Sequence, residues 1–463
     1  MRKLQPNPES LAVVNKHAEF RALLALAIPV VFSELGWMSM AIIDTIMVGH
    51  VGPVAIGAVA VGSFVYYCPA LFGIGILLGL DTLVSQAHGR GDFDECHRWL
   101  AQGAYIAIGF TPIAMLAALG AVHLFPFWGV NPIVGAEATR FLQLLNWSTL
   151  PLLFYAAARR YLQGVGRVRP VMFALLSANL VNLAGNWLLI YGKLGFPAMG
   201  VRGSALSTCV ARVYMAAVLI YAAWRYEAQR GHSLFEHWPG PEIARIRRML
   251  TLGIPAAGQI LMEVGAFGAA TVMAARLSPE ALAAHQIALN SASLTYMVPL
   301  GISAAAAVSV GHAIGAGDGA RARRAGWMAM AAGIAFMSLA TVAFLVIPRS
   351  ILYVYTENFE VLRIGVPLLA LAGAFQIFDG IQTVSTGALR GLGQTRLPMV
   401  ANLIGYWFFG LPLGYTLCFV AGWGVWGLWL GLTLALIAIA IVLLAKWARE
   451  SRLLSTRPAG YPG

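Results

Sequence analysis

Residues 84–92 read VSQAHGRGD, and residues 310–318, lying 226 positions later, read VGHAIGAGD. The same offset relates residues 27–29, which read AIP, to residues 253–255, which read GIP. An offset of 227 relates LQGVG at 162–166 to LRGLG at 389–393. Matches at nearly one offset over this distance indicate that the chain is an internal duplication.

The composition predicts that both copies lie in a membrane. Of the 463 residues, 59% are hydrophobic and 11% are charged, whereas about 25% are charged in an ordinary soluble domain. The mean hydropathy of +0.74 indicates that most of the chain takes part. Stretches apolar and long enough for a membrane helix occur at 20–49, 53–83, 99–125, 137–158, 170–192, 200–224, 246–275, 280–313, 325–347, 361–389, 397–420 and 424–446.

Twelve spans give six to each copy, an even number, so the second copy begins on the same side of the membrane as the first. This predicts an all-α polytopic protein of two six-helix bundles related by a pseudo-two-fold axis along the membrane normal. A polar segment joins them and is predicted to be a linker. The expected organisation is an N-terminal segment at 1–19, a first lobe at 20–225, the linker at 226–245, a second lobe at 246–448 and a tail at 449–463.

The positive charges predict the orientation. If the N-terminus is cytoplasmic, that side carries 24 Lys and Arg and the opposite side carries 6, with Arg212 alone inside a span. The positive-inside rule then places both termini in the cytoplasm and the protein in the cell inner, or plasma, membrane. The formal net charge of +12 is explained by these loops. We therefore expect the lipid bilayer as a partner and no nucleic acid.

Two acids fall inside spans of the second copy. Glu263 lies near the middle of span 7 with Gln259 on the same face, and Asp379 lies deep in span 10 with Thr383 one turn later. An ionised carboxylate inside a bilayer costs about 2.5–3.5 kcal/mol. Each acid is therefore predicted to face a wet cavity, carry a proton or meet a cation. A buried structural hydrogen-bond donor is the alternative.

Span 8 adds amides to this copy. Gln286 and Asn290 share a helical face, and Tyr296 lies close by. These residues are candidates for lining a substrate cavity. Hydrogen bonding between helices explains them nearly as well.

The first copy carries its own polar residues. Asp44 lies toward the outer end of span 1, and Asn179, Asn182 and Asn186 form one face of span 5 that is predicted to point at something polar, such as Asp44. Hydrogen bonding between helices is the alternative explanation of these asparagines. Glu34 is either a cavity-lining acid or a structural acid with a partner.

Three residues are candidates for moving parts. Pro29 and Pro255 occupy equivalent positions of the repeat and remove a backbone hydrogen bond within spans 1 and 7, which suits a hinge. Asp81, near the cytoplasmic end of span 2, is predicted to be a gate or capping residue rather than a cation ligand.

No enzymatic motif emerges. The chain has no P-loop, so ATP is not expected to drive the movement of a substrate through the cavity. An ion gradient must then supply this energy, with Na⁺ or H⁺ as coupling ion and no other cofactor. The histidines are scattered without ligand spacing, and His285 is expected to pack or to hydrogen bond rather than to catalyse. An intramembrane enzyme is therefore not predicted.

The sequence resembles the multidrug and toxic compound extrusion (MATE) transporters, and among them the NorM-like branch. The resemblance covers about residues 20 to 448. It rests on the twelve-span duplication, on an acid in span 7 and another in span 10, and on the segments DTIMVG at 44–49, QAHG at 86–89, GAGD at 315–318 and LRG at 389–391.

The resemblance implies a V-shaped antiporter that exports bulky organic cations, including drugs and dyes, in exchange for Na⁺ or H⁺. It implies that Glu263 and Asp379 bind the coupling cation, as a Na⁺ site if sodium drives transport, with Tyr296 over the ion or drug. It also implies that Asp44 and the asparagines matched by Asn182 and Asn186 form a second cation or proton site.

One rival within the same superfamily is a flippase for lipid-linked sugars or an exporter of a metabolite. A flippase cavity should be cationic to hold a pyrophosphate, whereas acids outnumber arginines in the predicted spans. Each chain holds a complete pathway, so we expect it to function as a monomer.

Overall fold

The computed structural model describes residues 8–230 and 238–454, with side chains from residue 17 onward. The predicted terminal segment, linker and tail lie partly outside the described residues. In the N-terminal half the helices are α1 (Pro8–Gly49), α2 (Pro53–Leu77), α3 (Gly79–Gly89), α4 (Phe93–Ala121), η1 (Val122–Leu124), α5 (Pro132–Leu145), η2 (Asn146–Ser148), α6 (Thr149–Gly164), α7 (Arg169–Tyr191) and α8 (Val201–Ala228). The C-terminal half holds α9 (Ile243–Ala274), α10 (Pro279–Gly315), α11 (Gly319–Val346), α12 (Pro348–Tyr353), α13 (Phe359–Gly391), α14 (Arg396–Asn402), η3 (Leu403–Gly410), α15 (Leu411–Tyr415), η4 (Thr416–Val420) and α16 (Gly424–Leu454).

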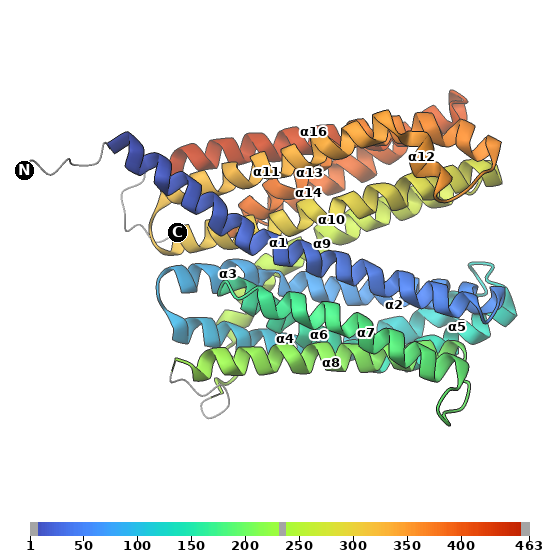
Figure 1. The fold of residues 1–463 in the computed structure, drawn as a ribbon, viewed down its shortest axis with the longest axis horizontal. Coiled ribbons are helices and arrows are strands. Elements are labelled where there is room, and N and C mark those ends of the chain that lie inside the picture. Colours follow the sequence, from blue (N-terminus) through green and yellow to red (C-terminus); the bar gives the residue numbers. More distant parts are fainter. Residues whose placement is uncertain (1–7, 231–237, 455–463) are drawn as a thin grey trace, which may run out of the picture.

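The helices form two bundles lying side by side, an N-lobe of α1–α8 and a C-lobe of α9–α16 (Figure 1). Eleven helical segments of the described chain are long and apolar enough to cross a membrane. The twelfth span is α5 and α6, which the short 3₁₀ turn η2 joins, so neither piece reaches the length on its own. The predicted twelve-helix fold is confirmed.

The structure also confirms the repeat in detail. Asp92 and Asp318 each cap a helix by accepting a hydrogen bond from the backbone N–H three residues later, at 3.0 and 2.8 Å. The glycines before them, Gly91 and Gly317, have φ of +77° and +73°, a conformation that other residues rarely adopt. The two matching segments therefore fold into the same turn.

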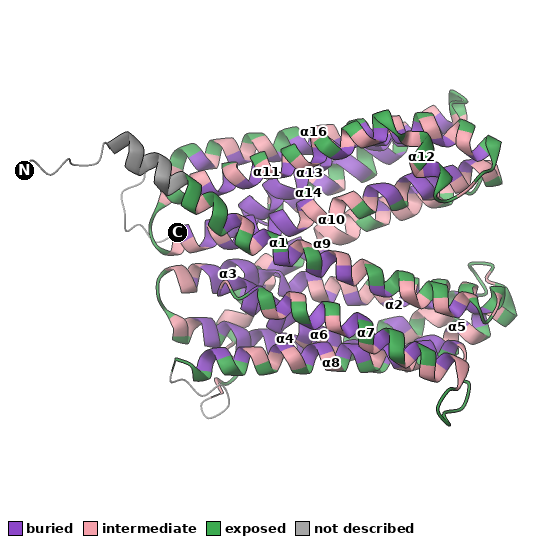
Figure 2. Cartoon of the chain, viewed as in Figure 1, coloured by how far each residue is buried: buried purple, intermediate pink, exposed green. Residues whose placement is uncertain are grey.

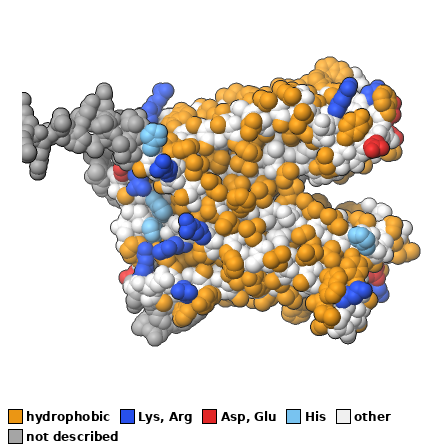
Figure 3. Space-filling model, viewed as in Figure 1, with side chains coloured by type: hydrophobic (Ala, Val, Ile, Leu, Met, Phe, Trp, Pro, Cys, Tyr) orange, Lys and Arg blue, Asp and Glu red, His pale blue; other side chains and the backbone are white. Residues whose placement is uncertain are grey.

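Each lobe has its own core, and one helix crosses from each lobe to the other. Residues classed as buried are concentrated in the middle of both bundles (Figure 2). Leu23 and Ala27, at the start of α1, pack in the C-lobe cluster, whereas Met249 and Ala257, at the start of α9, pack in the N-lobe cluster. The crossing helices hold the lobes together at one end. At the other end, beside α5 and α12, a cleft separates the lobes and gives the V shape (Figure 3).

Glycines bring the lobes into backbone contact at the closed end. A Cβ on Gly89 would lie 2.2 Å from the carbonyl oxygen of His312, and one on Gly315 would lie 2.1 Å from that of Gln86. These two contacts are related by the repeat, because His312 is the counterpart of Gln86 and Gly315 that of Gly89. Small residues let membrane helices approach this closely.

Gly253 tests the packing of a crossing helix. A Cβ at this position would lie 2.0 Å from the carbonyl oxygen of Ile76 in the other lobe. We expect Gly253→Ala to destabilise the protein by about 1–3 kcal/mol, the usual cost of overpacking, with a lower melting temperature of the purified protein in detergent. Gly268→Ala in the same helix is the control, because a Cβ there meets nothing within 4 Å. Equal melting temperatures for the two variants would contradict the expectation.

Candidate functional site

In the described part of the chain, three arginines are buried inside the bundles and a fourth, Arg160, is largely covered. The expectation that Arg212 is the only interior arginine is wrong, because Arg159 and Arg390 are also buried and the side chain of Arg160 is 11% exposed. The count assigned these three to loops, whereas α6 and α13 continue through them to Gly164 and Gly391. Buried guanidinium groups require counterions, and Glu34 and Asp81 supply them.

Asp81 joins the two lobes at the closed end. Its carboxylate is fully buried and accepts hydrogen bonds from Arg160 Nη1 of the N-lobe, at 3.5 Å, and from Arg390 Nη1 of the C-lobe, at 3.2 Å. The neighbouring Thr82 donates its hydroxyl to the backbone carbonyl of Arg390. Asp81 is thus placed between the lobes, as a gate residue would be, and its role in gating stays a prediction.

Two further hydrogen bonds join the lobes at the closed end, across the interface that we call the seam. The two bonds are related by the repeat. Gln86 Nε2 donates to the carbonyl oxygen of Gly391 at 3.0 Å, and His312 Nε2 donates to that of Gly164 at 2.6 Å. Gly391 and Gly164 are repeat counterparts, as are Gln86 and His312. The closed end is therefore a two-fold set of contacts with the Asp81 ion pairs added.

The N-lobe holds a small polar cavity at Asp44. The cavity, of about 160 Å³, lies between α1, α2 and α8. Asp44 Oδ1 accepts from Asn186 Nδ2 at 2.6 Å and Oδ2 accepts from Thr208 at 3.1 Å, while Asn186 also donates to Asn182 at 3.2 Å. The structure thus brings together the aspartate and both predicted asparagines. Asn182 Nδ2 is buried without a hydrogen-bond partner among the described residues.

Arg212 borders this cavity. It donates to Ser148 at 2.7 Å and to the hydroxyl of Tyr67 at 3.0 Å, and its guanidinium lies 4.7 Å from the ring centre of Tyr66. The charge is therefore held by hydroxyls and an aromatic face. Its positive field also reaches Asp44.

Two other polar residues of the N-lobe have structural partners. Asn179 donates to the backbone carbonyls of Gly36 and Leu175, at 2.9 and 2.8 Å, rather than to Asp44. Glu34 is 9% exposed and forms an ion pair with Arg159. Of the two interpretations of Glu34, a cavity-lining acid or a structural acid with a partner, the structure supports the second.

The C-lobe holds acids of a different kind. Asp379 is 4% exposed and Glu263 is half-buried, and both carboxyl groups lie within electrostatic range of each other and of the phenol of Tyr296. Neither carboxylate forms an ion pair anywhere in the described part of the chain. The structure therefore brings together the three residues predicted to bind the coupling cation, on α9, α10 and α13.

The remaining candidate residues of the C-lobe differ in how far they are buried. Thr383 is 6% exposed, and its hydroxyl lacks a hydrogen-bond partner among the described residues. Gln259 and Gln286 are half-buried, and Asn290 is exposed. Their predicted place in a substrate cavity stays a prediction.

Tyr406 belongs to the same region and was not predicted. It is fully buried on η3, a π-helical segment, and donates to Gln382 Oε1 at 3.3 Å. The charges of Glu263 and Asp379 reach its phenol. No residue pattern in the sequence marks a π-helix, although such segments concentrate at functional sites.

The two candidate hinges lie inside unbroken helices. Pro29 and Pro255 are buried in α1 and α9, next to the points where these helices meet the opposite lobe. Whether the helices bend there stays a prediction. His285, in contrast, has an assigned place: it hydrogen bonds to Thr271 and to Trp429, each at 2.9 Å, as expected of a packing residue.

Comparison with known proteins identifies the family. The MatE family model matches the chain twice, over residues 29–188 and 255–416. The chain belongs to the MATE family. The double match covers equivalent parts of the two lobes and agrees with the offset of 226 between the copies.

Curated relatives place the chain near NorM. It is 35% identical over 443 residues to a probable multidrug resistance protein NorM of Mesorhizobium japonicum, covering 94% of this chain and 95% of the relative. It is 32% identical to the multidrug resistance protein MdtK of Yersinia pseudotuberculosis, covering 93% and 96%. Solved structures share the fold: the eukaryotic MATE transporter AtDTX14 superposes with a TM-score of 0.81 at 22% identity, covering 95% of this chain and 98% of that one.

The ion pair between the lobes can be tested by a double-mutant cycle. We expect Asp81→Asn to lower the free energy of unfolding by about 3–5 kcal/mol, because it leaves the guanidinium groups of Arg160 and Arg390 without their shared counterion, and Arg390→Gln to lower it by less, because Asp81 keeps Arg160. The double variant should lose less than the sum. Denaturant titration in mixed micelles measures this. Glu360→Gln, in an exposed pair with Arg363, should cost under about 1 kcal/mol. Strict additivity of the first two variants would contradict an interaction.

Proposed function

We propose that this protein is a secondary active multidrug efflux antiporter that exports organic, mostly cationic and amphipathic compounds in exchange for inward Na⁺ or H⁺. The observation that carries the proposal is that the two C-lobe acids lie inside the bundle without an ion-pair partner in the described part of the chain. Asp379 is buried and Glu263 is half-buried in the apolar C-lobe, and neither acid has an ion-pair partner among the described residues. Buried carboxylates of this kind favour a visiting positive charge.

The distribution of charge supports a cationic cargo. Arg159 is ion-paired with Glu34, and Arg160 and Arg390 share Asp81, so each of these arginines has an acid beside it inside the protein. In the C-lobe the balance is reversed, and the acids lack such compensation. Aromatic side chains beside them, Tyr296 and Tyr406, suit an organic cation through cation–π contact.

The same balance disfavours a flippase for lipid-linked sugars, the alternative within the superfamily. A pyrophosphate site needs guanidinium groups that are free to bind an anion. Three of the four arginines inside the described bundles already bind carboxylates, and Arg212 binds hydroxyls and an aromatic ring. Transport of a cation is therefore the better-supported function.

Alternating access follows from the seam and the cleft. The closed end carries most of the Lys and Arg, which by the positive-inside rule makes it cytoplasmic and makes the cleft face outward. A coupling ion drives the cycle only if it binds one arrangement of the lobes better than the other. We infer that occupation of Glu263 and Asp379 biases that equilibrium, with bending near Pro29 and Pro255 as the moving step.

The N-lobe cavity provides a second place for a small cation or a proton. Asp44 faces about 160 Å³ of space and keeps hydrogen bonds from Asn186 and Thr208. A monomer in the plasma membrane, with both termini in the cytoplasm, contains both sites and the cleft.

Transport by reconstituted protein tests the function. In proteoliposomes that contain a fluorescent cationic dye, wild-type protein should move the dye against its gradient when a Na⁺ gradient or a pH gradient is imposed separately. Asp379→Asn and Glu263→Gln should slow ion-driven transport by about tenfold or more, a ratio that corresponds to about 1.4 kcal/mol.

The control is Glu360→Gln, an exposed acid of the same charge near the start of α13. It should transport at the wild-type rate. Unchanged ion-coupled transport by Asp379→Asn would contradict the role of Asp379 in binding the coupling cation. The absence of dye movement under both gradients would contradict the proposed function.

A further inference from the structure

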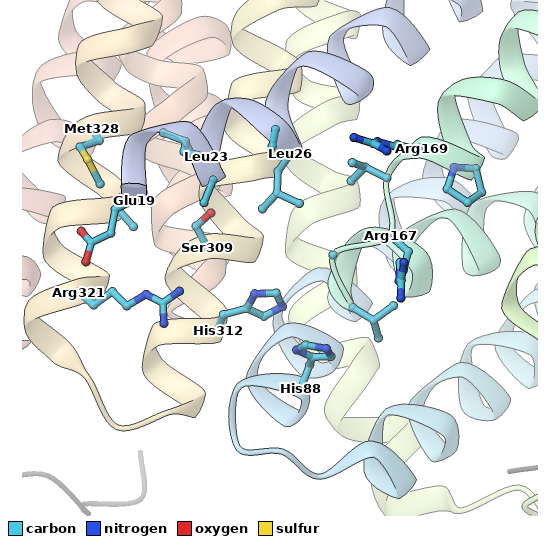
Figure 4. Close-up of a pocket in the computed structure, with 17 residues that line it drawn as sticks. Glu19, Leu23, Leu26, His88, Arg167, Arg169, Ser309, His312, Arg321 and Met328 are labelled. Atoms are coloured by element: carbon cyan, nitrogen blue, oxygen red, sulfur yellow. The ribbon is translucent and has the colours of Figure 1, made fainter. Parts of the chain in front are cut away.

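A second and larger cavity lies at the closed end, away from Asp44, Glu263 and Asp379. It measures about 690 Å³ and lies between the start of α1, the turn at residues 165–170, the end of α10 and the start of α11 (Figure 4). The N-lobe contributes the turn and His88, and the C-lobe contributes His312 and the start of α11. The cavity therefore has walls from both lobes.

One side of the cavity is basic. Arg167, Arg169 and Arg321 line it, together with His88 and His312, whose rings stack with centres 4.7 Å apart (Figure 4). Neither Arg169 nor Arg321 forms an ion pair within the described residues, and Arg167 lies 5.5 Å from the ring centre of Tyr226. This side therefore holds uncompensated positive charge.

The one acid of the lining does not cancel this charge. Glu19 accepts two hydrogen bonds from Arg324, at 2.8 and 2.9 Å, and so forms a bidentate pair of its own. Arg324 in turn is neutralised by that pair. The three arginines of the lining remain available to an anion.

The other side of the cavity is apolar. Leu23 and Leu26 of α1, Met328 of α11 and Val168 of the turn provide it. The basic residues lie at helix ends: Arg169 begins α7, Arg321 lies in the first turn of α11, and His312 lies in the last turn of α10. The cavity thus has a charged part at the level expected for lipid headgroups and an apolar part that continues along a membrane helix.

We propose that this cavity binds an anionic phospholipid, with its headgroup between Arg321 at one flank and Arg167 and Arg169 at the other (Figure 4), and with the start of an acyl chain along Leu23 and Leu26. A basic pocket between membrane helices on the cytoplasmic side has this preference, and the assignment of this end to the cytoplasm rests on the orientation in the proposed function. A free phosphate would use the basic side alone and leave the apolar wall unfilled.

Lipid in this cavity has a consequence for the lobes. Because both lobes supply its walls, an opening of the seam between His88 and His312 separates those walls and weakens binding. A ligand that binds one of two states more tightly shifts the population toward that state. The lipid therefore favours the arrangement in which the seam is closed and the cleft is open.

Lipid binding to the purified full-length protein tests the site without any transport assay. Native mass spectrometry in neutral detergent, with phosphatidylglycerol or phosphatidylcholine added, should show preferential retention of phosphatidylglycerol. The variant Arg167→Gln/Arg169→Gln/Arg321→Gln should weaken that retention by about tenfold or more, because each basic residue contributes to binding an anionic lipid. Its matched control, Arg202→Gln/Arg276→Gln/Arg349→Gln, removes the same charge at the opposite end.

Two results would overturn the site: equal retention by the triple variant and the wild type, or an equal loss in the control. Displacement of the lipid by millimolar glycerol phosphate would show that the headgroup binds without the chain and would overturn the assignment to a lipid. Spin labels at positions 198 and 355, one on each lobe at the end opposite the seam, test the consequence. Phosphatidylglycerol nanodiscs should lengthen their distance relative to phosphatidylcholine nanodiscs, and identical distances would overturn the coupling to lobe closure.

Discussion

A charge buried in this protein is costly unless another charge or a set of dipoles faces it, and this constraint organises the molecule. Asp81 illustrates it most directly, because its fully buried carboxylate faces guanidinium groups from both lobes. Separation of the lobes at this end removes at least one of those partners. The energy of the closed end is therefore tied to the relative position of the lobes, which is what a transporter with two alternating states requires.

The duplication makes the two lobes similar in backbone but not in chemistry. In the N-lobe, Asp44 is held by amides and a hydroxyl, and Arg212 lies within range of its charge. In the C-lobe, Glu263 and Asp379 interact with each other instead. One copy thus satisfies its acid internally, whereas the other leaves a negative site. The two lobes therefore share a backbone arrangement and differ in the partners of their acids.

The seam itself depends on residues that carry no charge. Gly89 and Gly315 allow backbone contact between the lobes, and Gln86 and His312 complete it with hydrogen bonds to repeat-related carbonyls. Backbone contacts and hydrogen bonds act over a short distance, so a small separation of the lobes breaks them. The phospholipid cavity borders this seam, and the lipid would add a ligand from the bilayer to a closure otherwise made by protein alone.

The sequence by itself determined the membrane location, the twelve spans and the parallel repeat, because hydrophobic length and a constant offset are properties of the chain alone. It also predicted that the asparagines of span 5 face Asp44, since helical spacing places them on one face; the structure shows this for Asn182 and Asn186 but not for Asn179. Only the tertiary structure showed that Arg159 and Arg390 are buried, that Arg160 is largely covered and that all three are paired, because their acidic partners lie on other helices, far away along the chain. For the same reason it alone revealed Tyr406 on its π-helix and the pairing of Glu34, which depend on neighbours far away along the chain.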